Sequence, residues 1–366
     1  MQLRRDKDVF ALLLVAVLST APLVAVFANE YRLTPTKEDM MWLLPDRAPA
    51  PADNITTPER VGLGKALFFD PRVSIEGNVS CASCHIPQFG WSDGLKTSKG
   101  INNTNLGRAT PTIINTGFNT IQYWDGRRPS LEKQASGPIL NSNMMATDMA
   151  ALVSWLGAEP FYQTWFARTY PDEPLDQAIV KALAAFQRTI ISNNSPFDQW
   201  LKGDQKAMTR QQIIGFRLFS DAKKANCVAC HHAPNFTDNG FHNVGLASYD
   251  LPKSDMGRFV HMPVAGLRGA FKTPTLRDIS LTAPYFHDGS ARTLLDVVEH
   301  FDQGGISQRD ISSGIKPLGL SVEEKQALVA FLQALTTHHA PVVLPTLPPP
   351  NPLNEQHVKL RERDAQ

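Results

Sequence analysis

The sequence predicts a mainly α-helical fold that contains two related units in tandem. Apolar residues in the longer segments follow helical spacing, whereas the strict alternation typical of half-buried strands is scarce. The chain also repeats itself weakly at a nearly fixed offset, which indicates an internal duplication. With 366 residues, of which 42% are apolar, the chain is long enough to form two modest hydrophobic cores.

The repeat is clearest around two cysteine motifs. In each unit a Gly-x-x-Leu-Phe segment comes before a Cys-x-x-Cys-His motif, and Phe, Asp and Gly residues follow it. The histidines of the two motifs, His85 and His231, are 146 residues apart. The Ala-Leu-Ala-Ala-Phe of residues 182–186 recurs in similar form at 327–331, 145 residues later. We therefore interpret the chain as one unit that has been duplicated.

Each unit is expected to begin with a short amphipathic helix, to continue through a cysteine-bearing turn, and to close with a longer helix. The second closing helix has the clearest pattern, because Ser321 and Glu324 form a capping-box sequence ahead of apolar residues at helical spacing. These apolar residues are Leu328, Phe331, Leu332 and Leu335. The first closing helix is expected at about residues 175–191, with apolar residues at Ile179, Leu183, Phe186 and Ile190.

The remaining segments have the composition of loops. Residues 96–112 and 232–256 are rich in Gly, Asn, Ser and Pro, and we expect them to wrap a buried object. Residues 341–366 are rich first in proline and then in charge. We expect this end of the chain to be an extended, mobile tail.

The first residues have the pattern of a secretory signal. A basic start is followed by an apolar span at residues 9–27, and cleavage is expected after Ala28. An uncleaved membrane anchor is the alternative, because the span approaches the length that crosses a bilayer. Ser19, Thr20 and Pro22 interrupt the span and favour the cleaved signal. In both cases the folded part of the protein is exported.

The charge and the cysteines narrow the class of protein. The formal net charge is +1, so no strong electrostatic footprint indicates a nucleic acid partner. Exported proteins with an even number of cysteines commonly contain disulfides. Here, however, all four cysteines fall in the two Cys-x-x-Cys pairs, which calls for a more specific interpretation.

Three kinds of site use such a pair. A redox dithiol of the thioredoxin type would need a βαβ setting that this sequence lacks. A zinc site with four thiolates would bring two pairs to one ion, usually across a short loop, whereas more than 140 residues separate these pairs. The third kind, covalent attachment of haem c, also uses the histidine that follows each pair. We therefore favour two haem attachment sites.

This interpretation assigns a haem to each unit. Cys81 and Cys84 would attach the first haem, with His85 as the axial ligand of its iron, and the second unit would use Cys227, Cys230 and His231. His232 is then expected near the surface or near a haem propionate. The predicted organisation is a signal peptide at 1–28, an N-terminal extension at 29–55, a cytochrome c-like domain 1 at 56–205, a cytochrome c-like domain 2 at 206–340 and a Pro-rich charged tail at 341–366.

The sequence segments around these motifs resemble those of a known family. They are LGKALFFDPRVS at 63–74, SCASCH at 80–85, QYWDGR at 122–127, FKTPTLRDISLTAPYFHDGS at 271–290 and VVEHFDQGG at 297–305. This combination resembles the bacterial di-haem cytochrome c peroxidase superfamily, which includes the MauG-type enzymes. The likeness covers about residues 56–338 and implies a periplasmic oxidoreductase with two haems.

The resemblance implies roles for particular residues. The N-terminal haem would be the hydrogen peroxide site, and the C-terminal haem would relay electrons. Trp124 matches the tryptophan that lies between the two haems, and His287 matches a residue near the second haem. Gln134 and Pro138 match positions on the distal side of the peroxide haem.

The sequence departs from the family at the distal acid. The family has a glutamate twenty residues after the tryptophan, which moves protons during O–O cleavage as a general acid–base. Here that position is Met144, followed by Met145. A thioether cannot transfer a proton, so efficient peroxide reduction is in question. Instead of taking part in proton transfer, Met144 could bind the first iron through its sulfur.

A second departure concerns the second haem. In relatives its sixth ligand is a methionine or tyrosine at the position that is Phe301 here, and a phenyl group cannot bind iron. This haem is then expected to be five-coordinate or to take another ligand. The candidates are His300, Met256, Met262 and His261.

A third departure concerns a calcium ion that the family holds between the haems. Thr282 and Pro284 match the turn that supplies carbonyl oxygens. The asparagine of the family is Ala109 here, which removes a side-chain oxygen from a site that depends on oxygen ligands. The sequence therefore leaves calcium open.

The leading hypothesis is a peroxidase or MauG-type oxidoreductase. Between His85 and His231 the sequence contains no histidine, so no distal histidine is expected from that segment, as in the MauG-like branch. The expected partners are hydrogen peroxide and either a small electron-donor protein or a protein substrate, and a homodimer is left open. The alternative is a non-enzymatic di-haem electron carrier or haem-based sensor. This alternative rests on Met144, because a methionine bound to the first iron would close it to peroxide.

Overall fold

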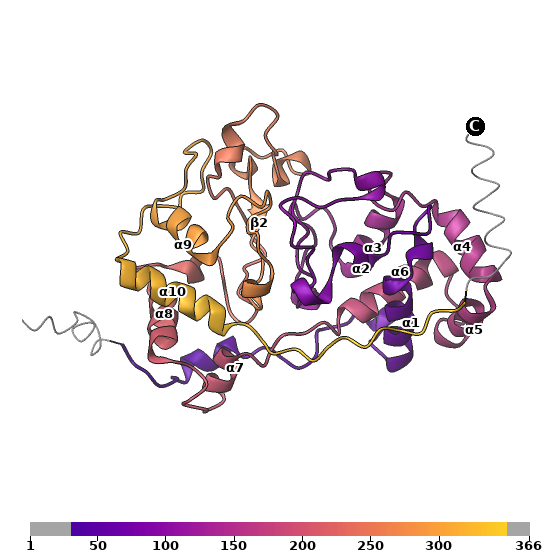
Figure 1. The fold of residues 1–366 in the computed structure, drawn as a ribbon, viewed down its shortest axis with the longest axis horizontal. Helices are drawn as coiled ribbons and strands as arrows, with labels where there is room; N and C mark the ends of the chain where they lie inside the picture. The colour runs from indigo at the N-terminus through magenta and orange to yellow at the C-terminus, as the bar shows by residue number, and fades with distance from the viewer. Residues whose placement is uncertain (1–30, 350–366) are drawn as a thin grey trace, which may run out of the picture. The chain divides into compact units, whose positions relative to one another are not determined.

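The computed structural model describes residues 31–349, and the predicted secretory signal at 1–28 lies outside them. Helices dominate the described chain, with one two-stranded antiparallel sheet, as Figure 1 shows. The α-helices are α1 (Pro58–Phe69), α2 (Cys81–Cys84), α3 (Leu131–Leu140), α4 (Met149–Ala158), α5 (Pro160–Thr169), α6 (Leu175–Gln187), α7 (Pro196–Leu201), α8 (Arg210–Ser220), α9 (Leu294–Asp302) and α10 (Val322–Ala334). The strands are β1 (Phe241–His242) and β2 (Phe271–Lys272), with Phe241 opposite Lys272. The mainly helical fold class is confirmed.

Local sequence explains where the helices begin. The predicted capping box before α10 is confirmed: Ser321 accepts a hydrogen bond from the Glu324 amide, and the Glu324 carboxylate accepts one from the Ser321 amide. Thr57 caps α1 and is followed by a proline at the first helical position. Helix α6 begins at Leu175 as expected, but it ends at Gln187 rather than near residue 191. The later residues instead pair with Asn115, whose amide donates to the Ile190 carbonyl.

The two halves use the same close helix crossing. Helix α1 packs against α6 in the first half, and α8 packs against α10 in the second. A Cβ atom at Gly64 would overlap the carbonyl oxygen of Ala182, and one at Gly215 would overlap that of Ala327. These glycines therefore let the helix backbones meet. The internal duplication itself stays a prediction.

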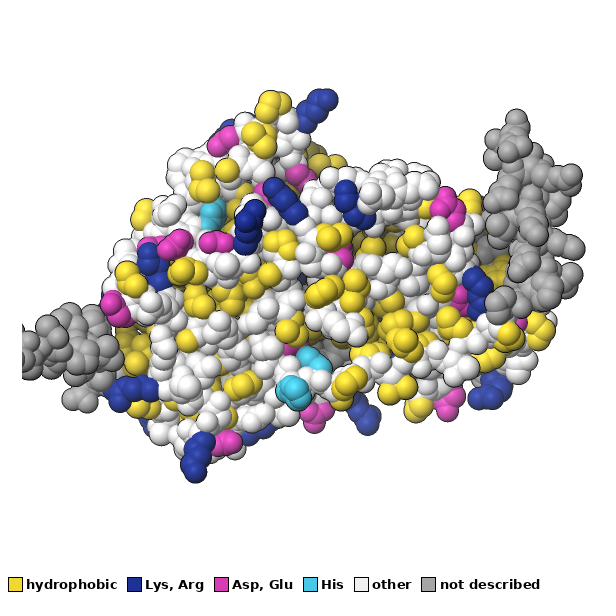
Figure 2. All heavy atoms as spheres, viewed as in Figure 1, with side chains coloured by type: hydrophobic (Ala, Val, Ile, Leu, Met, Phe, Trp, Pro, Cys, Tyr) yellow, Lys and Arg dark blue, Asp and Glu magenta, His cyan; other side chains and the backbone are white. Residues whose placement is uncertain are grey.

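Apolar and charged side chains are interspersed over the face of the molecule in Figure 2. No single sign of charge dominates this face, which agrees with the net charge of +1. In the part of the chain that the structure describes, no helix is long and apolar enough to cross a membrane.

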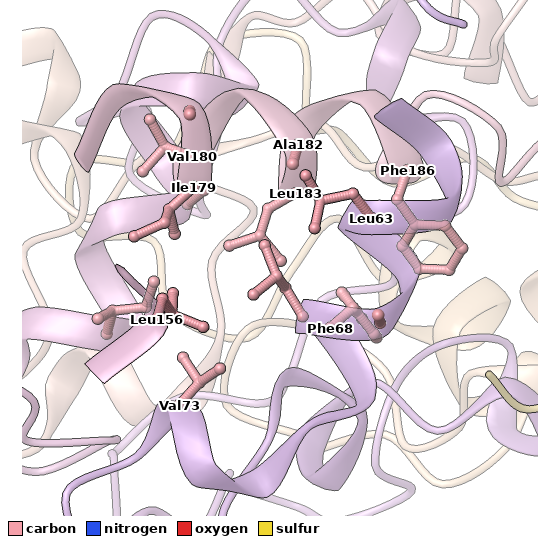
Figure 3. Close-up of a cluster of buried hydrophobic side chains, with 14 of the residues drawn as sticks. Leu63, Phe68, Val73, Leu156, Ile179, Val180, Ala182, Leu183 and Phe186 are labelled. Atoms are coloured by element: carbon pink, nitrogen blue, oxygen red, sulfur yellow. The ribbon is translucent and has the colours of Figure 1, made fainter. Parts of the chain in front are cut away.

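Each half has its own apolar core. In the first half, side chains of α6 such as Leu183 and Phe186 meet Leu63 and Phe68 of α1, as Figure 3 shows. In the second half the core is mainly aromatic, and Phe197, Phe216, Phe219, Phe236 and Phe331 have neighbouring ring centroids 4.8 to 6.2 Å apart. Burial of each such ring stabilises the fold by about 1.5–3 kcal/mol.

The N-terminal extension belongs to the core of the second half. Trp42 is buried, and its ring centroid lies 4.5 Å from that of Phe236. Its carbonyl oxygen accepts a hydrogen bond from Arg277, whose guanidinium also forms a buried ion pair with Asp198. The extension therefore folds with the second half rather than as a separate piece.

The C-terminal tail is extended as expected, but its described part is not free. The Thr337 amide and the His339 imidazole both donate to the carboxylate of Asp278. Farther along, Val342 and Leu347 pack against the apolar core of the first half. These two side chains attach the described part of the tail to the first half, and the mobility of the tail stays a prediction. We call residues 336–349 the C-terminal strap.

Candidate functional site: two cysteine and histidine motifs and the residues between them

Helix α2 presents the first cysteine motif. Ser80 and Ser83 form a capping box at its start, and the His85 amide donates a 2.9 Å hydrogen bond to the Cys81 carbonyl at its end. Both cysteines are free of disulfides, and burial raises the pKa of the Cys81 thiol to about 12 and that of Cys84 to about 11. These thiols stay protonated at neutral pH, which disfavours a reactive dithiol or a thiolate metal site.

The His85 imidazole is oriented by the backbone. Its Nδ1 lies 2.9 Å from the Trp91 carbonyl oxygen and donates a hydrogen bond to it. Burial lowers the pKa of His85, so the ring is neutral and Nε2 keeps its lone pair. A histidine whose Nδ1–H is held by a carbonyl is the usual arrangement of a metal ligand that binds through Nε2.

A pocket beside His85 gathers the residues predicted for the distal side. It has a cavity volume of about 50 Å³ within a larger hollow that opens to solvent. Gln134 and Pro138 of α3 line it together with Met144, Met145 and the cysteine motif. The structure thus brings the predicted distal residues to one pocket.

The pocket holds one buried polar atom without a partner. The amide oxygen Oε1 of Gln134 is buried and accepts no hydrogen bond from the described residues. Such an atom is costly unless a ligand or water donates to it. Among the residues that line the pocket, none is an Asp, Glu, Lys or Arg. The chemistry of the lining therefore fits a haem with a small polar ligand, and the pocket contains no carboxyl group to transfer protons.

The second motif repeats the geometry of the first. The His231 amide donates to the Cys227 carbonyl at 2.9 Å, and His231 Nδ1 donates to the Phe236 carbonyl at 2.8 Å. Burial lowers the pKa of His231 to about 4 and raises that of Cys227 to about 12. Each half therefore presents a neutral histidine whose Nδ1 is held by a backbone carbonyl, next to a buried thiol, Cys81 or Cys227, with a raised pKa.

An ion pair beside the second motif was missed by sequence reasoning. His242 lies on β1, half-buried, with Nε2 2.8 Å from an Asp238 carboxylate oxygen. This hydrogen bond raises the pKa of His242 to about 10, and their atoms cluster with the Cys230 sulfur. The only sequence signal for this pair is the Asp-x-x-x-His spacing, which indicates no contact until the fold is known.

Trp124 joins the two halves through backbone groups. Its indole Nε1 donates a 2.9 Å hydrogen bond to the Ala109 carbonyl, and the Ala109 amide donates to the His287 carbonyl at 2.7 Å. The Trp124 carbonyl accepts a hydrogen bond from the Lys272 amide of β2 at 2.7 Å. The indole therefore lies where first-half and second-half residues meet.

His287 is also part of this junction. Its ring stacks on Phe271, with centroids 3.4 Å apart, and its centroid is 6.5 Å from that of Trp124. Burial lowers the pKa of His287 to about 4, so the imidazole is neutral. The neutral imidazole is therefore held by ring contacts with Phe271 and Trp124.

At the position where the family has a calcium-binding asparagine, the structure places no side-chain oxygen. Ala109 occupies it, and both backbone groups of Ala109 are already used by Trp124 and His287. Thr282 and Pro284 lie in the expected turn.

The candidate ligands of the second haem lie in different settings. His300 is buried, but its Nε2 is committed to the Val244 carbonyl at 2.7 Å, and its ring packs against Phe301. Met262 is exposed, and exposed His261 lies 3.4 Å from the Asp125 carboxylate. The Met256 side chain is half-buried.

Two Cys-x-x-Cys-His motifs on a helical fold, each with a histidine oriented for metal binding, define a di-haem protein of the cytochrome c class. The sequence model described as "Di-haem cytochrome c peroxidase" matches residues 58–206. The chain belongs to the di-haem cytochrome c peroxidase and MauG family. Members of this family are haem peroxidase-type oxidoreductases, so haem is the cofactor.

Individual relatives support this membership over most of the chain. The chain is 44% identical to the methylamine utilization protein MauG of Methylorubrum extorquens, across 83% of this chain and 86% of that protein. It is 36% identical to the cytochrome c551 peroxidase of Nitrosomonas europaea, across 81% and 86%. Among solved structures, a MauG-like protein associated with microbial copper homeostasis superposes with a TM-score of 0.75 at 31% identity, across 81% of this chain and 95% of that one.

Proposed function

We propose that this protein is a periplasmic oxidoreductase that reduces hydrogen peroxide beside His85 and takes electrons from a partner protein through the half that contains His231. The observation that carries the proposal is the unpartnered Oε1 of Gln134 in the pocket beside His85. A bound peroxide has an O–H group that can donate to this oxygen.

Haem c would be attached covalently in each half. The residues that would hold it are Cys81, Cys84 and His85 in a domain spanning 56–205, and Cys227, Cys230 and His231 in a domain spanning 206–340. When bound, the haem supplies an iron that takes the peroxide oxygen and exchanges electrons. The protein fixes both imidazoles by their Nδ1 hydrogen bonds, so Nε2 of each would be the nitrogen that binds iron.

Proton supply is the step in which this chain departs from its family. Reduction of one peroxide to two waters consumes two electrons and two protons. Met144 stands where a carboxylic acid would serve, and the other described residues lining the pocket offer no acid of matching strength. Gln134 can orient the ligand but keeps its own protons. The protons would therefore come through water in the open side of the pocket.

Electrons would cross the junction at Trp124. The indole is held by Ala109, whose amide is bonded to His287, and His287 is stacked on Phe271 of β2. The source of the electrons would be either a small electron-donor protein or an oxidisable side chain of a protein substrate. An exported chain with a signal at 1–28 would meet this partner in the periplasm.

Stopped-flow absorbance spectroscopy of the oxidised, haem-loaded protein tests the proposal. Mixing with stoichiometric hydrogen peroxide is expected to change the haem spectrum within the first turnover and to consume the peroxide. An unchanged spectrum at both haems with peroxide left intact would overturn the proposal.

A second candidate function follows from Met144. Its thioether lines the same pocket as His85, so a Met144 sulfur bound to iron would close the site and make the protein an electron carrier or a sensor. An oxidised spectrum with a methionine–iron charge-transfer band that is lost in Met144→Leu would favour this function. A high-spin first haem with no such band would favour the peroxide reaction.

A further inference from the structure

An unusual group of exposed apolar side chains lies on the segment before β2. Leu251, Val260, Met262 and Val264 are 62%, 64%, 46% and 55% exposed, and they fall within a 14-residue stretch. Elsewhere in the described chain, large exposed apolar side chains are scattered singly or in neighbouring pairs. A concentration of this kind is a common feature of protein interaction sites. We call residues 251–268 the apical loop; Figure 1 draws it above β2.

The apical loop is closed by hydrogen bonds at its base. Gly257 pairs with Ala270 in a bridge, and the Gly269 amide donates to the Met256 carbonyl at 3.1 Å. A Cβ at Gly257 would overlap the Ala270 carbonyl, so this close pairing requires glycine. The loop therefore presents its apolar side chains from a fixed backbone, which lowers the entropy lost when a partner binds.

The same loop is fastened to the backbone beside Trp124. Arg258 donates to the carbonyl oxygens of Asp125 and Gly126, at 3.1 and 2.6 Å. Asp255 forms an ion pair with Arg108, which also pairs with Asp125. A protein seated on the apical loop is thus coupled to the segment that carries the inter-half tryptophan.

The charges on the loop set the kind of partner. Lys253 and Arg268 are exposed, and neither forms an ion pair with a carboxylate of the described residues. The acidic residues nearby have basic partners, because Asp255 pairs with Arg108 and Asp250 lies 3.7 Å from Arg309. Figure 2 shows apolar, basic and some acidic side chains together at this end of the molecule. The surface is complementary to an apolar patch with an acidic rim.

We infer that the apical loop is the docking site for an electron-exchange partner protein whose contact face has an apolar centre and an acidic rim. The inference rests on the proposed function, in which a partner protein supplies electrons. Apolar contacts of Val260 and Met262 provide affinity, and Lys253 and Arg268 provide steering and orientation.

Electron transfer without peroxide tests this inference. The probe is a reduced monohaem cytochrome c with an acidic surface, mixed with the oxidised protein in a stopped-flow instrument. In the double variant Val260→Ser, Met262→Ser the second-order rate constant is expected to fall at least about tenfold, since affinity is concentrated in a few apolar anchors. In Lys253→Glu, Arg268→Glu it is expected to fall similarly and to lose its decrease with added salt.

Matched controls separate docking from a general surface effect. Val343 and Leu344 are 78% and 68% exposed on the C-terminal strap, so Val343→Ser, Leu344→Ser should leave the rate constant unchanged. A basic monohaem cytochrome c should react faster, not slower, with the charge-reversed variant. Equal rate constants for the loop variants and the wild type with the acidic probe would overturn the inference, as would an equal loss in the strap control.

Two further readouts complete the test. If sedimentation shows a concentration-dependent dimer that Val260→Ser, Met262→Ser abolishes, a second copy of this chain covers the loop and the inference is wrong. Peroxide consumption is measured separately on the same variants. Loop-dependent electron transfer in a protein that does not consume peroxide would support docking while overturning the proposed function.

Discussion

The indole nitrogen of Trp124 donates a 2.9 Å hydrogen bond to the carbonyl oxygen of Ala109. The next link is the Ala109 amide, which donates to the carbonyl of His287. One alanine therefore fixes the tryptophan of the first half against a histidine of the second. The position that could have supplied a calcium ligand is used to hold the junction directly.

Replacing Trp124 with phenylalanine removes both the donor and the larger ring. We expect peroxide to change the spectrum of the first haem only, because the aromatic bridge to the second half is weakened. The orphaned Ala109 carbonyl should lower the free energy of unfolding by about 1–3 kcal/mol. Stopped-flow spectra and denaturant titration measure the two effects. Trp165→Phe is the control, since Trp165 packs against Phe161 on α5, away from Trp124; a similar spectral loss there would contradict the role of Trp124.

Gln134 is expected to position peroxide through its unpartnered Oε1. Gln134→Leu keeps the approximate volume and removes this acceptor, so the rate constant for the peroxide reaction should fall by about 10–100-fold, the scale of one or two lost hydrogen bonds. The spectrum of the resting protein should stay unchanged. Gln187→Leu, at another polar position of the pocket lining, is the matched control. A Gln134→Leu protein that reacts at the wild-type rate would show that the oxygen serves packing alone.

Met144→Glu would restore an acid to the pocket. A positioned general acid–base contributes about 10²–10⁴-fold, so the peroxide reaction should accelerate within or below that range. The variant should also gain a pH dependence that the wild type lacks, because a carboxyl group titrates and a thioether does not. Rate constants measured from about pH 4 to about pH 8 supply the test, around the usual carboxyl pKa of about 4.3. Met144→Leu should show neither the acceleration nor the pH dependence.

The sequence predicted the site better than it predicted the assembly around it. The cysteine motifs depend on neighbours three or four residues apart, and the distal residues follow Trp124 within one segment, so local patterns were enough to place them. Gln134 and Met144 indeed share a pocket with His85. The unpartnered state of the Gln134 oxygen, by contrast, depends on every side chain around it and has no sequence pattern.

Long-range packing explains what sequence reasoning missed. Trp42 packs against Phe216 in the core of the second half, although about 170 residues separate them in the sequence. No periodic pattern in the sequence predicts a contact over this separation. Residues 341–366 were expected to form an extended, mobile tail, because proline-rich composition predicts extension. Val342 and Leu347 nevertheless find an apolar surface on the first half, which only the folded chain creates.

The buried ion pair of Arg277 and Asp198 should be a strong determinant of stability. Both side chains are fully buried, and both Asp198 oxygens accept hydrogen bonds from Arg277 at 2.9 Å. Arg277→Met leaves the carboxylate buried and unpaired, which should cost about 3–5 kcal/mol in the free energy of unfolding. Denaturant titration measures the loss. Adding Asp198→Asn to the same chain should recover part of the stability, whereas a loss that is unaffected by the second change would point to packing as the cause.

The C-terminal strap should detach more easily as the pH rises. The hydrogen bond to Asp278 raises the pKa of His339 above its ordinary value of 6.5 in the folded protein. A group whose pKa is raised by folding makes its full contribution to the free energy of unfolding at pH values below its unfolded pKa of about 6.5. This contribution is lost as the pH rises through the folded pKa. His339→Gln should therefore lower the Tm most at about pH 5 and least at about pH 9. Because the imidazole is partly exposed, the effect should stay below about 1 kcal/mol. A difference in Tm between wild type and variant that is constant over this range would contradict the assigned protonation, and Val343→Ser provides a strap variant without a titrating group.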